Sequence, residues 1–420
     1  MSSLNEKPQL IMVGAGMAGM RFLDELLALS QAYQITVFNR EPHGGYNRIM
    51  LSPVLAGEKT LEEIITHDSD WFAANDITLQ THCSISRIDA KSQIITTEQG
   101  EDFNYDRLII ATGSNPFVLP IANTDLACVV SFREIADVEL MQKASASGKQ
   151  AVVIGGGLLG LEAAYGLQKQ GMQVAVVHRS SILMNAQLDA RAGEILQSEL
   201  SNATPQRAGM QFYMQSEVAE IIANQTGTHI QAVRLKDGQE IACDLLVMAI
   251  GIRPNIVLAE SAGLASNRGI LVNDQLETNI ANIYALGECV EHNGHTYGLV
   301  APLYQQAKVL AQILASKVGD YQAEVLPAYQ GSLTSTMLKV TGINLFSAGE
   351  FNGTEGAETL VFTDAAQNIY RKLVIANQRI IGAVLYGDTY AANWFFELLQ
   401  QRMDISQCKD TLLFGEGFSN

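Results

Sequence analysis

The chain has 420 residues, of which 47% are hydrophobic and 17% charged, and its 44 acidic and 27 basic side chains give a formal net charge of −17. A chain of this length can bury a large core and favours two or three domains. The acidity opposes contact with a phosphate backbone, so we expect no nucleic-acid partner.

The sequence contains few signs of targeting or metal binding. The first ten residues lack the basic and apolar regions of a signal peptide, and the apolar stretch at residues 151–167 is too short and too interrupted to span a membrane. The five cysteines lie far apart, without the CxxC spacing of a redox disulfide or a zinc site. We therefore expect a cytoplasmic protein with reduced thiols, no membrane contact and no metal.

The first motif is a glycine-rich turn between an apolar strand, residues 10–13, and a helix with apolar residues at helical spacing. The turn has the pattern GxGxxG, which in this context is typical of dinucleotide-binding folds. In such folds the pyrophosphate lies at the helix N-terminus. The residues predicted to hold it are Gly14, Ala15, Gly16, Met17, Ala18 and Gly19.

The second predicted strand, residues 34–38, ends where dinucleotide folds place an acid on the adenosine ribose. Asn39 occupies that position, followed by Arg40 and Glu41. An asparagine can hydrogen-bond a hydroxyl and Glu41 can supply the carboxylate, so we expect all three to contact a cofactor. The alternative interpretation is a polar strand end without a ligand. Further along, the sequence predicts a helix over residues 60–72.

The glycine motif then occurs a second time, at residues 155–160, again between an apolar strand and a helix. Two such turns, each in full strand–turn–helix context, predict two dinucleotides. The strand that follows, residues 173–177, ends at His178 and Arg179 where an acid would favour a ribose 2′-hydroxyl, whereas these side chains can accept a 2′-phosphate. The predicted contacts of this turn are Gly155, Gly157, Leu158, Leu159 and Gly160.

Several later segments complete the pattern: a hairpin turn at residues 236–239, an antiparallel set of strands at 359–362, 370–375 and 380–386, and a terminal helix at 391–402. The sequence as a whole predicts an α/β fold.

Residues 41–57 read Glu-Pro-His-Gly-Gly-Tyr-Asn-Arg-Ile-Met-Leu-Ser-Pro-Val-Leu-Ala-Gly, residues 111–114 read Ala-Thr-Gly-Ser, and residues 287–289 read Gly-Glu-Cys. With the two glycine turns, these segments resemble the flavoprotein module of assimilatory nitrite and nitrate reductase large subunits. That module belongs to the FAD/NAD(P)H-dependent pyridine nucleotide-disulfide oxidoreductase superfamily, with rubredoxin and ferredoxin reductases. The resemblance covers essentially the whole chain.

The resemblance implies two Rossmann-like dinucleotide-binding domains, for FAD and NAD(P)H, and a smaller α+β C-terminal domain for dimerisation or partner docking. The implied boundaries are 1–121 and 253–320 for the FAD-binding domain, 122–252 for the NAD(P)H-binding domain and 321–420 for the C-terminal domain. Since relatives without the acid at residue 178 include NADH users, the choice between NADH and NADPH stays open.

Site residues follow from the same resemblance. Glu162 is implied to lie near the nicotinamide as the candidate catalytic or positioning residue, although a carboxylate favoured by the helix dipole is an equal alternative. Pro53 replaces the lysine of related reductases, Glu288 replaces an aspartate, and no cysteine precedes Cys83, which argues against thiolate chemistry. The remaining implied cofactor contacts are Arg48, Ser52, Ile85, Ala111, Thr112, Gly113, Gly251, Gly287, Glu288, Leu299 and Ala301.

The expected function is electron transfer from NAD(P)H through FAD to a separate acceptor protein, a nitrate or nitrite reductase component. The sequence lacks the cysteine sets of iron–sulfur and siroheme domains, so we do not expect it to reduce nitrite itself. A rubredoxin or ferredoxin is the alternative acceptor. A non-enzymatic NAD(P)H-sensing flavoprotein and a peroxide-forming oxidase are alternatives of other kinds, and a homodimer is compatible with each.

Overall fold

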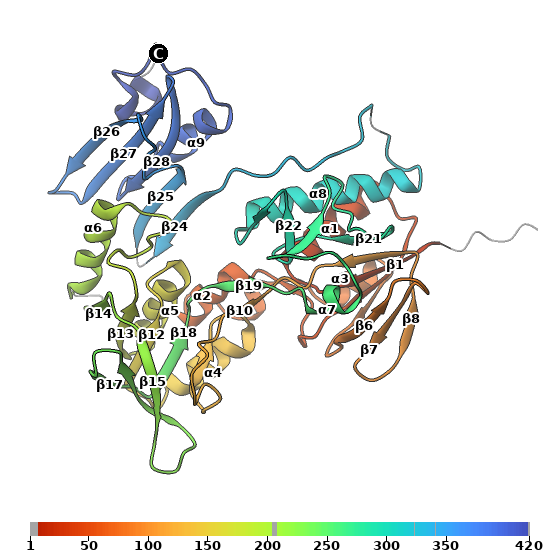
Figure 1. Ribbon diagram of the computed structural model, residues 1–420, viewed down its shortest axis with the longest axis horizontal. Helices are drawn as coiled ribbons and strands as arrows, with labels where there is room; N and C mark the ends of the chain where they lie inside the picture. Colours follow the sequence, from red (N-terminus) through yellow and green to blue (C-terminus); the bar gives the residue numbers. More distant parts are fainter. Residues whose placement is uncertain (1–6, 204–207, 323, 341, 419–420) are drawn as a thin grey trace, which may run out of the picture. The chain divides into compact units, whose positions relative to one another are not determined.

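The computed structural model describes residues 7–203, 208–322, 324–340 and 342–418 and divides into two compact units (Figure 1). Unit 1 combines segments 1–50, 60–115 and 252–332, and unit 2 combines segments 51–59, 116–251 and 333–420. Each unit is therefore assembled from separate stretches of sequence. The implied division into three domains is finer than this one and stays a prediction.

A five-stranded parallel sheet forms the centre of unit 1, in the strand order β21-β9-β1-β2-β5. Its side chains alternate between two cores: Leu10 and Met12 face one, Ile11 and Val13 the other. A sheet covered on both faces needs apolar residues throughout, which explains the continuous apolar run. The strands are β1 (Gln9–Val13), β2 (Gln34–Phe38), β5 (Ile77–Gln80), β9 (Arg107–Ile110) and β21 (Ile283–Ala285).

Helices α1 (Met17–Leu29) and α8 (Val300–Lys317) pack side by side on one face of this sheet. The α1 residues Phe22, Leu23 and Leu26 are fully buried there, as their helical spacing predicts. The small sheet β6-β7-β8 and helix α7 cover the other face. The bounds are β6 (Ile85–Asp89), β7 (Ile94–Thr97), β8 (Asp102–Asn104), α7 (Val257–Ser261), β20 (Ile270–Val272), β22 (Val290–His292), β23 (His295–Thr296), η1 (Arg48–Met50), β10 (Ser114–Pro116) and β19 (Ile252–Pro254).

The helix predicted over residues 60–72 is wrong. In its place lie η2 (Glu62–Ile64), β4 (Ile65–His67) and a short helix, α3 (Ser69–Ala74). The Asp68 side chain accepts a hydrogen bond from Trp71 N at 2.9 Å, which caps α3 and starts it there. The residues before Asp68 pair with strand β3 (Gly45–Tyr46). Strand pairing and the cap together divide the segment into short elements.

Unit 2 contains a second five-stranded parallel sheet, in the order β11-β18-β12-β13-β14. Helix α5 (Leu158–Lys169) contacts its central strands, and the antiparallel sheet β15-β16-β17 covers one face. The turn between β16 and β17 falls at residues 236–239, where the sequence predicts a hairpin. The bounds are β11 (Val129–Ser131), α4 (Ile135–Ser145), β12 (Gln150–Ile154), β13 (Gln173–His178), β14 (Gln211–Met214), β15 (Val218–Ala223), β16 (Ile230–Leu235), β17 (Glu240–Ala242) and β18 (Leu245–Met248).

Residues 51–59 belong to unit 2, although the residues on either side of them belong to unit 1. They form helix α2 (Leu51–Leu55), which packs on α5 so closely that a Cβ at Gly166 would lie 2.6 Å from the Leu55 side chain. Gln170 Nε2 donates to the Leu55 carbonyl at 2.8 Å. This packing carries Ser52 into unit 2.

The C-terminal part of unit 2 is a five-stranded antiparallel sheet, in the order β24-β25-β28-β27-β26, with helix α9 (Ala392–Gln400) on one face. The last three strands and the helix lie where the sequence predicts them, whereas β24 and β25 are not predicted. Strand β26 lies at the sheet edge, and its Val361 and Phe362 are 51% and 41% exposed. The strands are β24 (Ser335–Val340), β25 (Ile343–Gly349), β26 (Glu358–Asp364), β27 (Ile369–Ala376) and β28 (Arg379–Tyr386), followed after α9 by η3 (Leu412–Phe414) and η4 (Glu416–Phe418).

Buried polar contacts join this sheet to helix α6 (Ala190–Ser201) within unit 2. Asp189 caps α6, since its Oδ1 accepts from Ala192 N at 3.1 Å. The other carboxylate oxygen accepts from the Tyr370 hydroxyl at 2.7 Å and from Lys372 Nζ at 3.0 Å. A single carboxylate thus holds both the helix start and strand β27.

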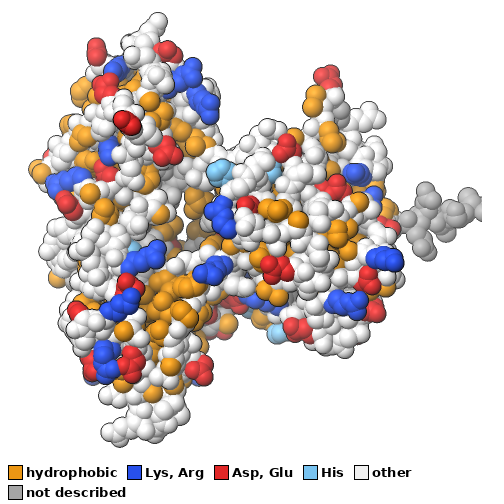
Figure 2. All heavy atoms as spheres, viewed as in Figure 1, with side chains coloured by type: hydrophobic (Ala, Val, Ile, Leu, Met, Phe, Trp, Pro, Cys, Tyr) orange, Lys and Arg blue, Asp and Glu red, His pale blue; other side chains and the backbone are white. Residues whose placement is uncertain are grey.

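Charged side chains of both signs are spread over the surface. On the face shown in Figure 2, Lys and Arg side chains alternate with Asp and Glu side chains over both units, so the acidic excess does not gather in one patch there. Among the described residues, no helix combines the length and the apolar character needed to cross a bilayer.

Candidate dinucleotide sites

The first glycine turn joins β1 to α1 in unit 1, as the sequence predicts. Gly14 N donates to the Phe38 carbonyl at 2.8 Å, and its φ of +107° is rare for residues with a side chain. A Cβ at Gly14 would overlap the carbonyl oxygen of Ala111, and a Cβ at Gly19 would lie 2.8 Å from the Gly14 oxygen. The fold itself therefore requires both glycines.

Gly16 has a different role in this turn. Its φ of −75° and ψ of 177° suit any residue, and a Cβ there would meet no described atom within 4 Å beyond its chain neighbours. The open space lies at the N-terminus of α1, where the first N–H groups have no partner within the helix. The turn thus has the room and the donors that a pyrophosphate needs. The other predicted contacts here are buried Ala15 and half-buried Met17 and Ala18.

The second glycine turn, between β12 and α5 in unit 2, has the same division of roles. Gly155 has a φ of +118°, and a Cβ on it would overlap the carbonyl oxygen of Ala249. A Cβ on Gly160 would overlap the Gly155 oxygen, whereas one on Gly157 would meet no described atom within 4 Å beyond its chain neighbours. Two of the glycines are required by packing, and the space over Gly157 fits a second pyrophosphate. The half-buried residues that begin α5 are Leu158 and Leu159.

Two other predicted segments come together beside the first turn. The Ala111 carbonyl lies against the first glycine of the turn, and a Cβ at Gly287 would lie 3.0 Å from the Ala18 side chain. The Ser114 hydroxyl donates to a carboxylate oxygen of Glu288 at 2.7 Å. The Ala-Thr-Gly-Ser and Gly-Glu runs are therefore joined directly.

The same region is held by backbone and amide contacts. The Thr112 hydroxyl donates to the Asn255 carbonyl at 2.9 Å, and Asn255 N donates to the Gly113 carbonyl at 2.9 Å. Gly287 N donates to Oε1 of the fully buried Gln306 at 2.8 Å. The remaining implied contacts are Leu299, which precedes α8, Ala301 in its first turn, Ile85 at the start of β6, and Gly251 after β18.

At the end of β2 the predicted ribose contacts are engaged with one another and with the chain. Asn39 is buried, and its amide donates to the His43 carbonyl at 2.7 Å. Glu41 accepts from the Tyr46 hydroxyl and from Arg48, each at 2.7 Å, and the Arg48 guanidinium lies 5.0 Å from the centre of the Tyr46 ring. Glu41 and Arg48 thus form one ion pair, with Arg40 exposed beside them.

Ser52 and Glu162, implied to serve different cofactors, meet in unit 2. The Ser52 hydroxyl donates to a carboxylate oxygen of Glu162 at 2.6 Å. Burial raises the pKa of the Glu162 carboxyl, and the bond from Ser52 partly opposes that rise. Glu162 is therefore oriented by a neighbour and has a weakened acidity.

His178 is the last residue of strand β13 and Arg179 follows it, and the two side chains lie in different environments. His178 is buried, with Nδ1 accepting from Gly156 N at 3.0 Å, while Arg179 is exposed. The predicted pair is therefore split between the interior of the turn and the surface.

The chain has five cysteines, of which Cys243 and Cys289 are buried. All five are free, and burial raises the pKa of Cys243 to about 12 and that of Cys289 to about 11. Both thiols stay protonated at neutral pH. The described residues also contain no group of three or more His, Cys, Asp or Glu side chains placed to hold a metal ion.

A family model described as pyridine nucleotide-disulphide oxidoreductase matches residues 8–310, which include both glycine turns. The chain belongs to this family. A second model, the C-terminal domain of rubredoxin NAD+ reductase, matches residues 335–403, over the antiparallel sheet and the whole of α9.

Two curated relatives of this oxidoreductase come from Bacillus subtilis (strain 168). It is 46% identical over 402 residues to a nitrite reductase [NAD(P)H], covering 96% of this chain and 48% of the relative. It is 41% identical over 409 residues to an assimilatory nitrate reductase electron transfer subunit, covering 97% of this chain and 51% of the relative. The chain spans about half the length of these relatives.

A solved structure supports the same fold. Putidaredoxin reductase, in a covalent complex with putidaredoxin, has a TM-score of 0.85 to this oxidoreductase at 23% identity, over 98% of this chain and 96% of that one. At this identity the likeness concerns the fold.

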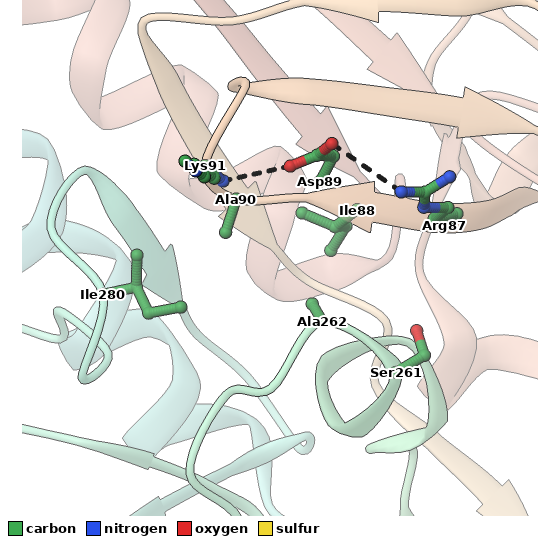
Figure 3. A pocket seen from close by; sticks show the side chains of 8 residues that line it. All are labelled: Arg87, Ile88, Asp89, Ala90, Lys91, Ser261, Ala262 and Ile280. Carbon is green, nitrogen blue, oxygen red and sulfur yellow. Dashed lines mark hydrogen bonds and ion pairs between the residues drawn. The ribbon is translucent and has the colours of Figure 1, made fainter.

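A separate hollow of about 490 Å³ lies in unit 1 of this oxidoreductase, between the end of β6 and α7 (Figure 3). Asp89 in it accepts from Lys91 N at 3.2 Å and lies 3.7 Å from Arg87. These charges are engaged at the turn after β6, and none of the predicted cofactor contacts lines the hollow. The lining residues are Arg87, Ile88, Asp89, Ala90, Lys91, Ser261, Ala262 and Ile280.

Three residues at these sites of the oxidoreductase are absent from the predicted contacts: Tyr46, Ser114 and Gln306. Tyr46 and Ser114 lie within the family-like runs, so their position in the sequence was a signal. Gln306 follows Leu303 by three residues and precedes Leu310 by four, which places an amide on the apolar stripe of α8. A polar side chain on such a stripe is the pattern that points to it.

Proposed function

We propose that this chain is a FAD-dependent NAD(P)H oxidoreductase with two Rossmann-like dinucleotide-binding domains and a smaller α+β C-terminal domain. The observation that carries the proposal is the repeated glycine turn. In each copy two glycines are required by packing, while the third, Gly16 or Gly157, faces open space at a helix N-terminus. Membership of the family supports the use of both cofactors.

We assign FAD to the turn in unit 1 and NAD(P)H to the turn in unit 2. The Ala-Thr-Gly-Ser and Gly-Glu runs, which resemble FAD-binding segments, both belong to unit 1. The proposed FAD contacts are Gly14 to Gly19, Asn39, Arg40, Glu41, Arg48, Ser52, Ile85, Ala111, Thr112, Gly113, Gly287, Glu288, Leu299 and Ala301. The residues assigned to the proposed NAD(P)H site are Gly155, Gly157 to Gly160, Glu162, His178, Arg179 and Gly251.

The two cofactors, when bound, supply the redox chemistry as hydride transfer from nicotinamide to flavin. The residues of the chain bind the two cofactors and orient them. The Ser52 hydroxyl orients the Glu162 carboxyl through its hydrogen bond. Because the pKa of this carboxyl is raised, Glu162 is protonated to a greater extent than an exposed glutamate at the same pH. Glu162 is on this proposal a positioning residue, and no cysteine thiolate takes part.

The proposed electron acceptor is a separate redox protein, a component of nitrate or nitrite assimilation. Two relatives of 46% and 41% identity carry nitrite reductase and assimilatory nitrate reductase electron transfer names. The match of residues 335–403 to a rubredoxin reductase domain favours a rubredoxin or ferredoxin as the second candidate. The exposed edge of the C-terminal sheet, at β26, is the proposed surface for a partner or a second copy.

Anaerobic titration with NADH and NADPH tests the cofactor proposal. We expect the purified protein to contain FAD, and one or both nucleotides to bleach its visible absorbance stoichiometrically. Absence of bleaching at large excess would show that NAD(P)H is not the donor. Rapid turnover with ferricyanide and slow reoxidation in air would separate electron transfer from sensing and from oxidase activity.

The acceptor is tested by mixing the reduced protein with purified candidates in a stopped-flow instrument. We expect fast flavin reoxidation by a nitrite or nitrate reductase component and slow reoxidation by rubredoxin. The reverse order would favour the rubredoxin reductase assignment.

A further inference from the structure

His178 lies at the end of β13, 8% exposed, and both of its ring nitrogens are engaged within unit 2. Gly156 N donates to Nδ1 at 3.0 Å. Nε2 lies 3.1 Å from the carbonyl oxygen of Ile182. The imidazole therefore bridges the second glycine turn and the segment that follows β13.

These two partners determine the form of the ring. Gly156 N–H can only donate, so Nδ1 must be unprotonated, and the Ile182 carbonyl can only accept, so Nε2 must carry the hydrogen. The neutral Nε2–H tautomer alone satisfies both contacts. An imidazolium would place an N–H at Nδ1 against the Gly156 N–H and lose that bond.

Gly156 is the middle residue of the Gly-Gly-Gly run, between packed Gly155 and open Gly157. A Cβ on it would lie 2.8 Å from the His178 ring, and its carbonyl accepts from Met184 N at 2.8 Å. His178 and Met184 thus hold the backbone N–H and the carbonyl of Gly156. Holding Gly156 sets the direction of Gly157 and the start of α5, where we assign the coenzyme pyrophosphate.

The surroundings of the ring keep it neutral. Burial lowers the pKa of His178 and the neighbouring Arg179 charge lowers it further, against opposing bonds from Ile182 and Asn185. The segment 182–188 carries no ionisable side chain, and β14, which pairs with β13, carries only Tyr213. Arg179 is therefore the charge that faces this imidazole.

We propose that His178 is a positioning residue for the nicotinamide coenzyme: it holds the second glycine turn in its binding shape through the Gly156 N–H and does not contact a 2′-phosphate. The inference rests on the proposed NAD(P)H site. Since His178 does not contact the 2′-phosphate, the exposed Arg179 is the cation that distinguishes NADPH from NADH on this proposal. Acidification then weakens binding of both coenzymes equally, because protonation releases the turn rather than altering a ribose contact.

Two variants separate the ring's contacts. In H178N the side-chain oxygen can take the place of Nδ1 and accept from Gly156 N–H without titrating, whereas in H178Q the longer amide reaches toward Ile182 and leaves Gly156 N–H without its acceptor. Binding of the oxidised coenzymes NAD+ and NADP+ to the FAD-loaded protein is measured by calorimetry between pH 4.5 and 8. The pKa and tautomer of His178 are read independently by ¹⁵N NMR of the native protein.

For the native protein we expect the Kd for NAD+ to rise as pH falls through the His178 pKa and to level off about tenfold higher, because protonation removes the same bond that H178Q lacks. H178N should bind with a flat profile over this range, and H178Q should bind about tenfold more weakly at every pH. The ratio of NADP+ to NAD+ affinity should be unchanged in H178N and lowered in R179A.

A Kd that stays flat through the pKa found by NMR, or an Nδ1–H tautomer, would overturn the positioning role. A selective loss of NADP+ binding in H178N would show that His178 contacts the 2′-phosphate instead. If the native protein bound neither coenzyme at any pH, the assignment of the second turn to NAD(P)H would itself fail. If the native protein binds the coenzymes and H178N and H178Q bind them with the same affinity and pH dependence, only the role of His178 would be overturned.

Discussion

The Ser52 hydroxyl lies 2.6 Å from a carboxylate oxygen of Glu162 and donates a hydrogen bond to it. The two residues come from segments implied to bind different cofactors, and they meet because α2 packs on α5 within unit 2. A serine that was expected to contact the flavin cofactor thus donates a hydrogen bond to the acid expected near the nicotinamide, and this bond affects the pKa of that acid.

Replacing Ser52 by alanine should destabilise the protein by about 1–2 kcal/mol, the usual contribution of a hydrogen bond to a carboxyl group. The Glu162 pKa should rise further, because the bond that opposes the effect of burial is lost. Urea unfolding measures the first effect. S147A, at an exposed serine of the same unit, is the control and should leave stability unchanged; an equal loss in both variants would contradict the prediction.

The stability of the protein should depend on the ionisation of Glu162. Its pKa is raised in the folded state, so its contribution to stability is fully present below the ordinary glutamate pKa and is lost as pH rises through the raised value. E162Q removes this dependence, so the native protein should lose stability relative to E162Q between pH 4 and 8. Urea unfolding across this range measures the difference.

The matched control for that experiment is E194Q, at a position 67% exposed on α6. It should keep the pH dependence of the native protein. Parallel curves for the native protein and E162Q would mean that burial does not alter the acidity of Glu162.

The first glycine turn offers a pair of substitutions that separate folding from cofactor binding. G16A should fold with nearly native stability, because its φ and ψ suit alanine and its Cβ meets open space, yet it should be purified with little FAD. G14A should be destabilised by about 1–3 kcal/mol or more, because of its φ of +107° and the overlap with Ala111. Flavin content and thermal unfolding are measured for both variants. Full flavin content in G16A would contradict the proposal that the FAD pyrophosphate binds at this turn.

We expect substitution of the buried Asp189 to destabilise unit 2 strongly. D189A removes the cap of α6 and leaves Lys372, whose side chain is 13% exposed, without its carboxylate, so we expect a loss of about 3 kcal/mol. D68A, which removes a cap from α3 alone, should lose only about 1 kcal/mol. Denaturant unfolding compares them, and similar losses would mean that the contacts to Tyr370 and Lys372 contribute little.

The parts of this structure that depend on local sequence could be predicted from it. The glycine turns, the strands before them and the hairpin at residues 236–239 each follow from residue type and spacing over a few positions. The segment at 60–72 failed because its structure depends on a partner strand, β3, and on the cap at Asp68.

The chemistry of the sites required tertiary contacts. That His178 is neutral follows from Gly156 and Ile182, and no property of the residue by itself distinguishes this buried form from a cation beside a phosphate. Likewise Glu162 becomes a weaker acid only through burial and Ser52, which lies 110 residues earlier in the chain. Residue types therefore predicted the two glycine turns, and packing determined the hydrogen bonds and the acidity of the side chains around them.

The order of strands in unit 1 has a consequence for how the chain folds during synthesis. Strand β9 pairs on one side with β1 and on the other with β21, which is made only after the whole parallel sheet of unit 2. The sheet of unit 1 therefore lacks its edge strand, β21, until that part of the chain has been made. Parallel pairing between strands so far apart in the sequence is intrinsically slow. A released fragment that ends near residue 260 contains every strand of the second parallel sheet but lacks β21, the edge strand of the first.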